Sequence, residues 1–89
     1  PLVPFGEVKQ EAGVPLNVYL GVYNGSPYIA VANQTLKPVS ARVSLPLAGV
    51  KQLRPLVTKE KRQPYFVKED TIEVDLTLQP MELRSFKAE

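Results

Sequence analysis

Prolines recur along this chain at short intervals, and their spacing limits the possible fold more than any other feature. From residue 15 onward they stand at positions 15, 27, 38, 46, 55, 64 and 80. Because proline has no backbone N–H group, it interrupts helices and is excluded from the middle of a sheet, so these positions mark the ends of short strands. Turn signals about 8–12 residues apart are typical of a β-sandwich or a β-barrel.

Between the prolines, apolar and polar residues alternate. Residues 39–45 (VSARVSL) and 71–78 (TIEVDLTL) show this period of two most clearly. Alternation predicts strands with one face toward a core and one toward water, and no window shows the spacing of an amphipathic helix. The sequence therefore predicts an all-β protein, an antiparallel β-sandwich of seven or eight short strands, Ig-like or similar. Its expected core residues are Val18, Leu20, Val22, Ile29, Val31, Val43, Leu45, Ile72, Val74, Leu76 and Leu83.

The 89 residues suffice for a single domain with one modest core. We expect residues 1–15 to be a linker or a loosely attached first strand, with 7–10 as the candidate strand, and residues 16–89 to form the sandwich. Further strands are expected near 50–54, at 65–68 and at 81–88. Because the chain starts with Pro1 and not with methionine, we also expect it to be a piece of a longer protein.

The dipeptide Asn24-Gly25 separates two strand-like segments and predicts a hairpin, because both residues tolerate the positive φ of a type I′ turn. This pairing places Tyr19, Tyr23 and Tyr28 together on the face opposite the core. A second hairpin is expected through residues 33–38 into the strand at 39–45.

The composition excludes most kinds of catalytic site. The chain contains no histidine and no cysteine, and its net charge is only +2. It therefore lacks the usual general base, the commonest metal ligand and a thiolate nucleophile. We expect no catalytic residues, no metal site and no cofactor, so this fragment is not expected to be an enzyme. No apolar run approaches the roughly 20 residues that a membrane-spanning helix needs, so no membrane partner is expected.

One pair of acidic residues has a spacing that occurs in enzymes. Glu73 and Asp75 lie two apart in a predicted strand, so their side chains share a face about 7 Å apart, as in some inverting glycosidases. An open strand face does nothing to remove water from either carboxyl group and raise its pKa. We therefore interpret the pair as part of a solvated face.

Basic residues gather between positions 51 and 68, where two aromatic residues, Tyr65 and Phe66, accompany them. Such a combination can bind phosphates and stack on bases. The weak charge of the whole chain and the loop-like TKEKRQP segment favour a solvated loop instead, and no nucleic-acid partner is expected. The basic residues are Lys51, Arg54, Lys59, Lys61, Arg62 and Lys68.

Two triplets, Asn24-Gly25-Ser26 and Asn33-Gln34-Thr35, match the acceptor pattern for N-glycosylation. Pro27 follows the first triplet directly and makes it a poor acceptor. Because asparagine is also common in turns, we interpret both triplets as turn residues.

The three tyrosines leave two interpretations open. They form either a platform on which sugar rings stack or a face that packs on a neighbouring domain. A sugar platform needs exposed and roughly coplanar rings, whereas a docking face needs only contiguous apolar surface. We expect no asparagine, aspartate or arginine on this face to fix a sugar's hydroxyl groups, which favours docking.

The most specific part of the chain is the C-terminal run Leu78-Gln79-Pro80-Met81-Glu82-Leu83-Arg84-Ser85-Phe86. It resembles the end of the C-terminal β-sandwich domain of multidomain glycoside hydrolases, and it is especially similar to the last residues of class II α-mannosidases. Residues 16–88 are similar to such domains in layout. The opening residues do not match that class, and none of its catalytic machinery is present.

The resemblance implies a non-catalytic accessory domain that packs against the catalytic domain of a parent glycoside hydrolase. It also favours a secreted or periplasmic location if the parent is such an enzyme. The alternative is an independent carbohydrate-binding or adhesion-type module that uses the Tyr19, Tyr23 and Tyr28 face.

Overall fold

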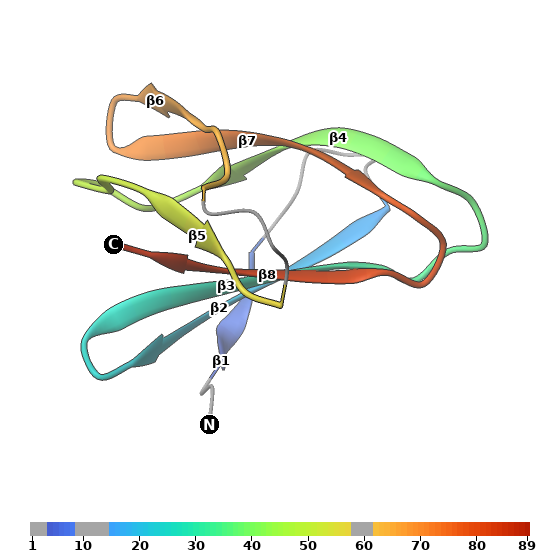
Figure 1. The fold of residues 1–89 in the computed structure, drawn as a ribbon, viewed down its shortest axis with the longest axis horizontal. Coiled ribbons are helices and arrows are strands. Elements are labelled where there is room, and N and C mark those ends of the chain that lie inside the picture. The colour runs from blue at the N-terminus through green and yellow to red at the C-terminus, as the bar shows by residue number, and fades with distance from the viewer. Residues whose placement is uncertain (1–3, 9–14, 58–61) are drawn as a thin grey trace.

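The fold is all-β, as the sequence predicts. The computed structural model describes residues 4–8, 15–57 and 62–89, and it has eight strands and no helix within these ranges (Figure 1). The strands are β1 (Pro4–Val8), β2 (Leu16–Tyr23), β3 (Ser26–Asn33), β4 (Val39–Leu45), β5 (Leu53–Pro55), β6 (Phe66–Lys68), β7 (Thr71–Leu78) and β8 (Leu83–Ala88).

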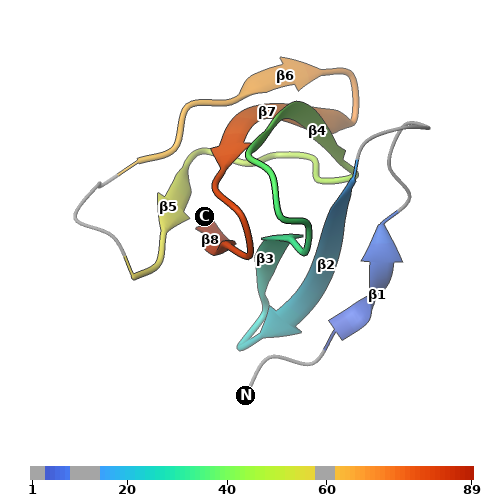
Figure 2. The same ribbon diagram turned by 90° about the vertical axis from the view of Figure 1, so that its right-hand side faces the viewer.

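The strands form two layers, which confirms the predicted antiparallel β-sandwich. One sheet has five strands in the order β1-β2-β3-β8-β5, and the other has three in the order β4-β7-β6. Figure 2 shows the two sheets almost end-on, with the smaller sheet covering part of the larger one. All strand pairs are antiparallel. The expected first strand is found at Pro4–Val8, paired with β2, whereas residues 9 and 10 lie outside the described ranges.

The first predicted hairpin is confirmed and the second is wrong. Asn24 and Gly25 form a two-residue loop between β2 and β3, with φ values of 51° and 79° as a type I′ turn requires. Residues 33–38, in contrast, carry the chain from β3 in the larger sheet to β4 in the smaller one. Figure 1 shows that this connection and the one from β7 to β8 lie at the same end of the sandwich.

The core lies between the sheets and consists of aliphatic residues around one phenylalanine. Eight of the eleven predicted core residues are buried, and Leu20 packs against them while partly exposed. The alternation in 39–45 and 71–78 correctly predicts the inward faces of β4 and β7. The complete buried cluster is Leu16, Val18, Ile29, Val31, Val43, Leu45, Leu53, Ile72, Val74, Leu76, Leu78, Phe86 and Ala88.

The prediction that Val22 and Leu83 belong to the core is wrong. Val22 is 37% exposed because the tip of the β2–β3 hairpin diverges from the smaller sheet (Figure 1). Leu83 is 65% exposed because it pairs with Ala32 on the outer face of the larger sheet. Strand β8 has apolar residues on both faces, and the larger Phe86 takes the inward face, with an exposure of 1%.

Replacing a buried residue of β7 should destabilise the domain far more than replacing its exposed partner. Ile72 is 1% exposed and pairs with Val67, which is 70% exposed. We expect Ile72→Ala to lower the free energy of unfolding by about 2–4 kcal/mol because it leaves a cavity. Val67→Ala should cost less than about 1 kcal/mol. Urea unfolding of both variants measures the difference, and equal losses would contradict the assigned register.

Candidate functional site

The three tyrosines named by the sequence lie together on the outer face of the larger sheet. Tyr19 and Tyr28 are partly buried, and Tyr23 is 42% exposed. The rings of Tyr23 and Tyr28 have centroids 6.4 Å apart and are nearly perpendicular, at 88°. Gly21 lies opposite Tyr28 in the strand register, so no side chain separates Tyr28 from its neighbours there. The rings therefore form a packed edge-to-face pair, not a coplanar platform.

The same face continues along the sheet as a mostly uncharged surface. Strands β2 and β3 contain no charged residue in their sixteen positions. Leu83 lies beside Ala32 and extends the apolar surface toward the other end of the sandwich. Charge on this face comes from the neighbouring strands: Glu7 of β1 lies opposite Tyr19, and Lys87 of β8 lies opposite Tyr28 and beside Arg54 of β5. We call this outer face, defined by Tyr19, Tyr23, Tyr28, Ala30, Ala32 and Leu83, the tyrosine face.

One expectation about this face is wrong. Asn17 alternates onto the side of Tyr19, so an amide is present there after all. Its Nδ2 atom donates to Oε1 of Gln34 at 2.5 Å, at the opposite end of β2 from Tyr23. The period of two along β2 places Asn17 on this face, but only the structure shows that its amide is hydrogen-bonded to Gln34.

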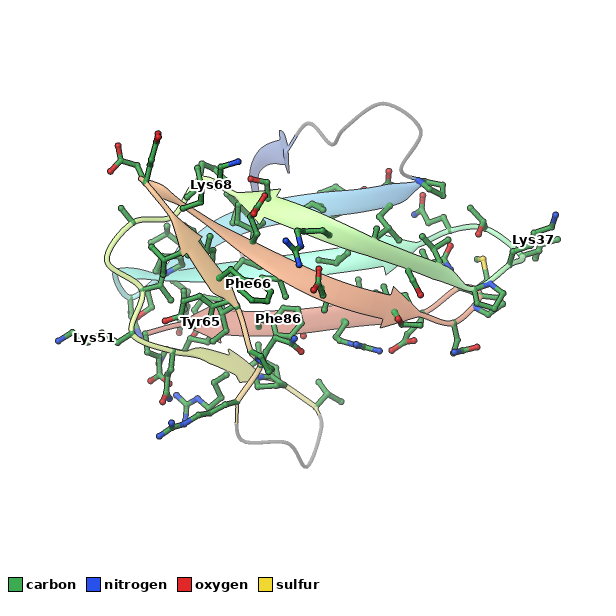
Figure 3. The ribbon with its side chains drawn as sticks, turned by 90° about the horizontal axis from the view of Figure 1, so that it is seen from above. Lys37, Lys51, Tyr65, Phe66, Lys68 and Phe86 are labelled. Atoms are coloured by element: carbon green, nitrogen blue, oxygen red, sulfur yellow. The ribbon has the colours of Figure 1, made fainter. Side chains whose placement is uncertain are left out.

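The outer face of the smaller sheet is polar, and its groups bond to one another. Arg42 on β4 donates two hydrogen bonds to the carboxylate of Asp75 on β7, at 2.7 and 2.9 Å. Its guanidinium carbon also lies 4.7 Å from the centre of the Phe66 ring. In the next pair along the sheet, the hydroxyl groups of Ser40 and Thr77 are 2.8 Å apart. Figure 3 shows Phe66 above the strands of this sheet.

These cross-strand contacts account for the acidic pair of Glu73 and Asp75 on this face. Both side chains lie on the outer face, as predicted, with Glu73 opposite Ser44 and Asp75 opposite Arg42. The hydrogen bond from Arg42 holds the pKa of Asp75 below its ordinary value. A general acid needs a raised pKa to keep its proton near neutral pH, so Asp75 does not fit that role. The pair belongs to the solvated face.

The basic segment does not form a stacking surface with its aromatic residues. The Tyr65 hydroxyl donates to the carbonyl oxygen of Val50 at 2.7 Å and packs beside the core, while Phe66, although 53% exposed, has the Arg42 guanidinium over its ring. Arg54 pairs with Glu89 at 2.9 Å. The predicted cluster members Lys59 and Lys61 lie outside the described ranges.

One depression of about 310 Å³ lies beside this segment. It is wide open, and its two cationic side chains, those of Lys51 and Arg62, are exposed. It therefore offers no enclosed, desolvated space in which a titratable group would acquire a shifted pKa. Its lining residues are Lys51, Gln52, Leu53, Arg62, Gln63, Pro64 and Tyr65.

Asn33 is the one buried polar residue of the described core, with an exposure of 0%. Its Nδ2 atom donates to the carbonyl oxygens of Lys37 at 2.8 Å, Leu78 at 3.2 Å and Gln79 at 3.1 Å. Its Oδ1 atom accepts from the backbone N–H of Thr35 at 3.0 Å and from the Thr35 hydroxyl at 2.6 Å. One amide thus joins the β3–β4 and β7–β8 connections.

The β7–β8 connection is closed by Glu82. Its Oε1 atom accepts from the N–H of Gln79 at 2.7 Å, and its Oε2 atom pairs with Arg84 at 2.7 Å. The Gln79 hydrogen bond, followed by that of Arg84, lowers the pKa of Glu82. Arg84 in turn donates to the carbonyl oxygen of Thr77, and the N–H of Asn33 donates to the carbonyl oxygen of Glu82.

The Asn33 triplet cannot be glycosylated in this fold. A glycan would be attached at Nδ2, which is buried and surrounded by three carbonyl oxygens. This agrees with the turn interpretation of the triplet. The threonine of the triplet also has a structural role, because its hydroxyl and its backbone N–H both donate to Asn33.

Comparisons with known proteins find no family model, no curated protein and no solved structure that matches the chain. Across the described ranges, no cluster of three or more metal-ligating side chains is found. The same ranges contain no helix that could span a membrane. The outer surfaces of the sandwich are therefore the features that bear on function.

Replacing the buried amide of Asn33 with a carboxylate should strongly destabilise the fold. In Asn33→Asp the shape is kept, but an acceptor faces the carbonyl oxygens of Leu78 and Gln79. We expect a loss of at least about 3 kcal/mol in unfolding free energy at neutral pH, because the carboxylate oxygen in place of Nδ2 is buried against carbonyl oxygens and has no donor. Asn17→Asp, on the outer face, should cost less than about 1 kcal/mol. Chemical denaturation compares them, and an Asn33→Asp variant as stable as wild type would refute this account.

The ion pair between Arg42 and Asp75 predicts how the stability of the fold changes with pH. Because the folded-state pKa of Asp75 is lowered, the pair stabilises the fold above the unfolded-state pKa, and this stabilisation is lost as the pH falls through the folded-state pKa. We expect the NMR titration midpoint of Asp75 to rise in Arg42→Met. The matched variant Arg54→Met removes a guanidinium elsewhere and should leave that midpoint unchanged. An unchanged midpoint in Arg42→Met would show that Arg42 does not cause the shift.

Proposed function

We propose that this chain is a non-catalytic accessory domain that docks through its tyrosine face on the catalytic domain of the same polypeptide. The resemblance of residues 78–86 to the end of glycoside hydrolase sandwiches suggests a glycoside hydrolase as the parent. In this role the domain covers and supports its neighbour without contacting the bond that is cleaved.

The observation that carries the proposal is the contrast between the two outer faces. The face of the smaller sheet bears Arg42 and Asp75, which neutralise each other. Most of the tyrosine face lies on β2 and β3, which contain no charged residue, in a chain with 20 charged residues among 89. Apolar and aromatic surface with few charges is typical of the centre of protein interfaces.

The shape of the tyrosine face also suits docking. Its centre is low, with Gly21, Ala30 and Ala32; Gly21 and Ala32 are already buried within the chain, and Ala30 is partly exposed. Tyr23 and Leu83 are 42% and 65% exposed at opposite ends of this strip. Each offers apolar area that burial against a partner would remove from water.

The alternative, a sugar-binding platform on the same rings, fits the geometry less well. Two sugar faces stacking side by side need rings in similar planes, whereas Tyr23 and Tyr28 are perpendicular. Tyr19 and Tyr28 are also partly buried, which reduces the ring area that a glycan can cover. The Asn17 amide is bonded to Gln34 and lies at the other end of the strand.

The first test measures self-association of the isolated chain. Without its partner, the tyrosine face should pair weakly with itself, so we expect concentration-dependent sedimentation that Tyr23→Ser and Leu83→Ser both reduce. The matched control is Val67→Ser, which removes an aliphatic side chain that is 70% exposed on the other sheet. If Val67→Ser reduces association as much as the other two variants do, the tyrosine face is not the contact surface.

The second test decides between docking and sugar binding. We expect no chemical-shift change at the three tyrosines when a glycan panel is titrated into the chain. Saturable shifts that vanish in Tyr23→Ala would establish the platform and reject the docking role. Because the chain lacks histidine and cysteine, we also expect no turnover of aryl glycosides.

A further inference from the structure

The tip of the β2–β3 hairpin exposes an asparagine next to a glycine. Asn24 and Gly25 form the two-residue loop between Tyr23 and Ser26, and both are exposed. A side chain built on Gly25 would meet no atom within 4 Å, so the turn is surrounded by open space. The Asn24 carboxamide makes no hydrogen bond to any residue in the described ranges.

This arrangement permits a reaction that needs only water. The backbone nitrogen of Gly25 attacks Cγ of Asn24, the side-chain nitrogen leaves as ammonia, and a five-membered succinimide forms. Water then opens the ring at one of its two carbonyl carbons, which yields aspartate or isoaspartate. Glycine favours the first step because it has no Cβ to hinder the approach and because its backbone moves freely.

We propose that Asn24 is a site of spontaneous deamidation whose product places a carboxylate on the otherwise uncharged β2–β3 hairpin. The step involves no change of oxidation state and consumes one water molecule for each ammonia released. It is a covalent modification that changes charge, and in the isoaspartate product it also lengthens the backbone by one carbon.

The other two asparagines of the chain are internal controls. Asn33 is buried, its carboxamide is fully hydrogen-bonded, and the larger Gln34 follows it. Asn17 lies inside a paired strand, its amide donates to Gln34, and the β-branched Val18 follows it. Both lack the open space and the following glycine that Asn24 has, so their reaction should be much slower.

The product lies at one end of the tyrosine face, next to Tyr23. Tyr23, next to Asn24, packs its ring against Tyr28 on the tyrosine face. A carboxylate here would have to lose water when a partner covers the hairpin tip, which opposes association. The isoaspartate product also puts an extra atom into a loop whose ends are held in register at Tyr23 and Ser26. This consequence depends on the proposed function, whereas the modification itself does not.

Peptide mapping by mass spectrometry tests the modification. The folded chain is incubated at mildly alkaline pH, and aspartate and isoaspartate are quantified at positions 17, 24 and 33 over time. We expect both products at position 24, at a rate at least several-fold above those at the other two positions, and slower reaction in Gly25→Ala. A rate at Asn24 no higher than at Asn17, or aspartate without isoaspartate, would overturn the proposal.

A separate measurement tests the consequence. We expect Asn24→Asp, which has the charge of the product and an unchanged backbone, to reduce self-association through the tyrosine face. Asp70→Asn changes charge in the β6–β7 turn of the other sheet and should have no such effect. Deamidation at Asn24 with unchanged association of Asn24→Asp would retain the modification site and reject its link to docking.

Discussion

The sandwich depends on one buried amide. Asn33 ends β3, and its side chain bonds to the connection that follows and to the end of β7, 45 positions later in the sequence. An aliphatic residue here would leave the carbonyl oxygens of Leu78 and Gln79 without this donor inside the fold, at a cost of about 1–3 kcal/mol for each unsatisfied buried group. Because β3 and β7 belong to different sheets, the same hydrogen bonds hold the two layers together at this end. Which residues point outward on each sheet is then given by the strand registers.

The two outer faces of the sandwich differ in character. On the smaller sheet, β4 pairs with β7 in a register that brings Arg42 opposite Asp75, so these two charges neutralise each other. On the larger sheet, β3 lies between β2 and β8, which places the uncharged hairpin in the middle and leaves Lys87 and Arg54 on neighbouring strands. A partner can therefore cover the tyrosine face without removing many charges from water, a process that would otherwise oppose association.

Local patterns in the sequence predict much of this fold, and contacts between distant segments account for the errors. Alternation identifies the inward faces of β4 and β7, and Asn24-Gly25 identifies the first hairpin, because both signals depend only on neighbouring residues. Strand β8 is ambiguous, since Leu83 and Phe86 are apolar on opposite faces and only packing between the sheets decides which is buried. The three tyrosines were placed on one face correctly by the period of two, but the angle between their rings depends on side-chain packing that alternation does not describe.

The C-terminal run has a structural explanation for most of its residues. Leu78 and Phe86 are buried on consecutive strands, Glu82 caps the turn between them, and Arg84 holds that glutamate while bonding to Thr77. Met81 lies at the turn with a positive φ of 59°. The burial of Leu78 and Phe86 and the hydrogen bonds of Glu82 and Arg84 account for these four residues by the closing turn alone. The run therefore supports the architecture directly, and it supports a glycoside hydrolase parent only through resemblance. The proposed docking role, in contrast, depends on the mostly uncharged tyrosine face and can be tested without knowing the parent.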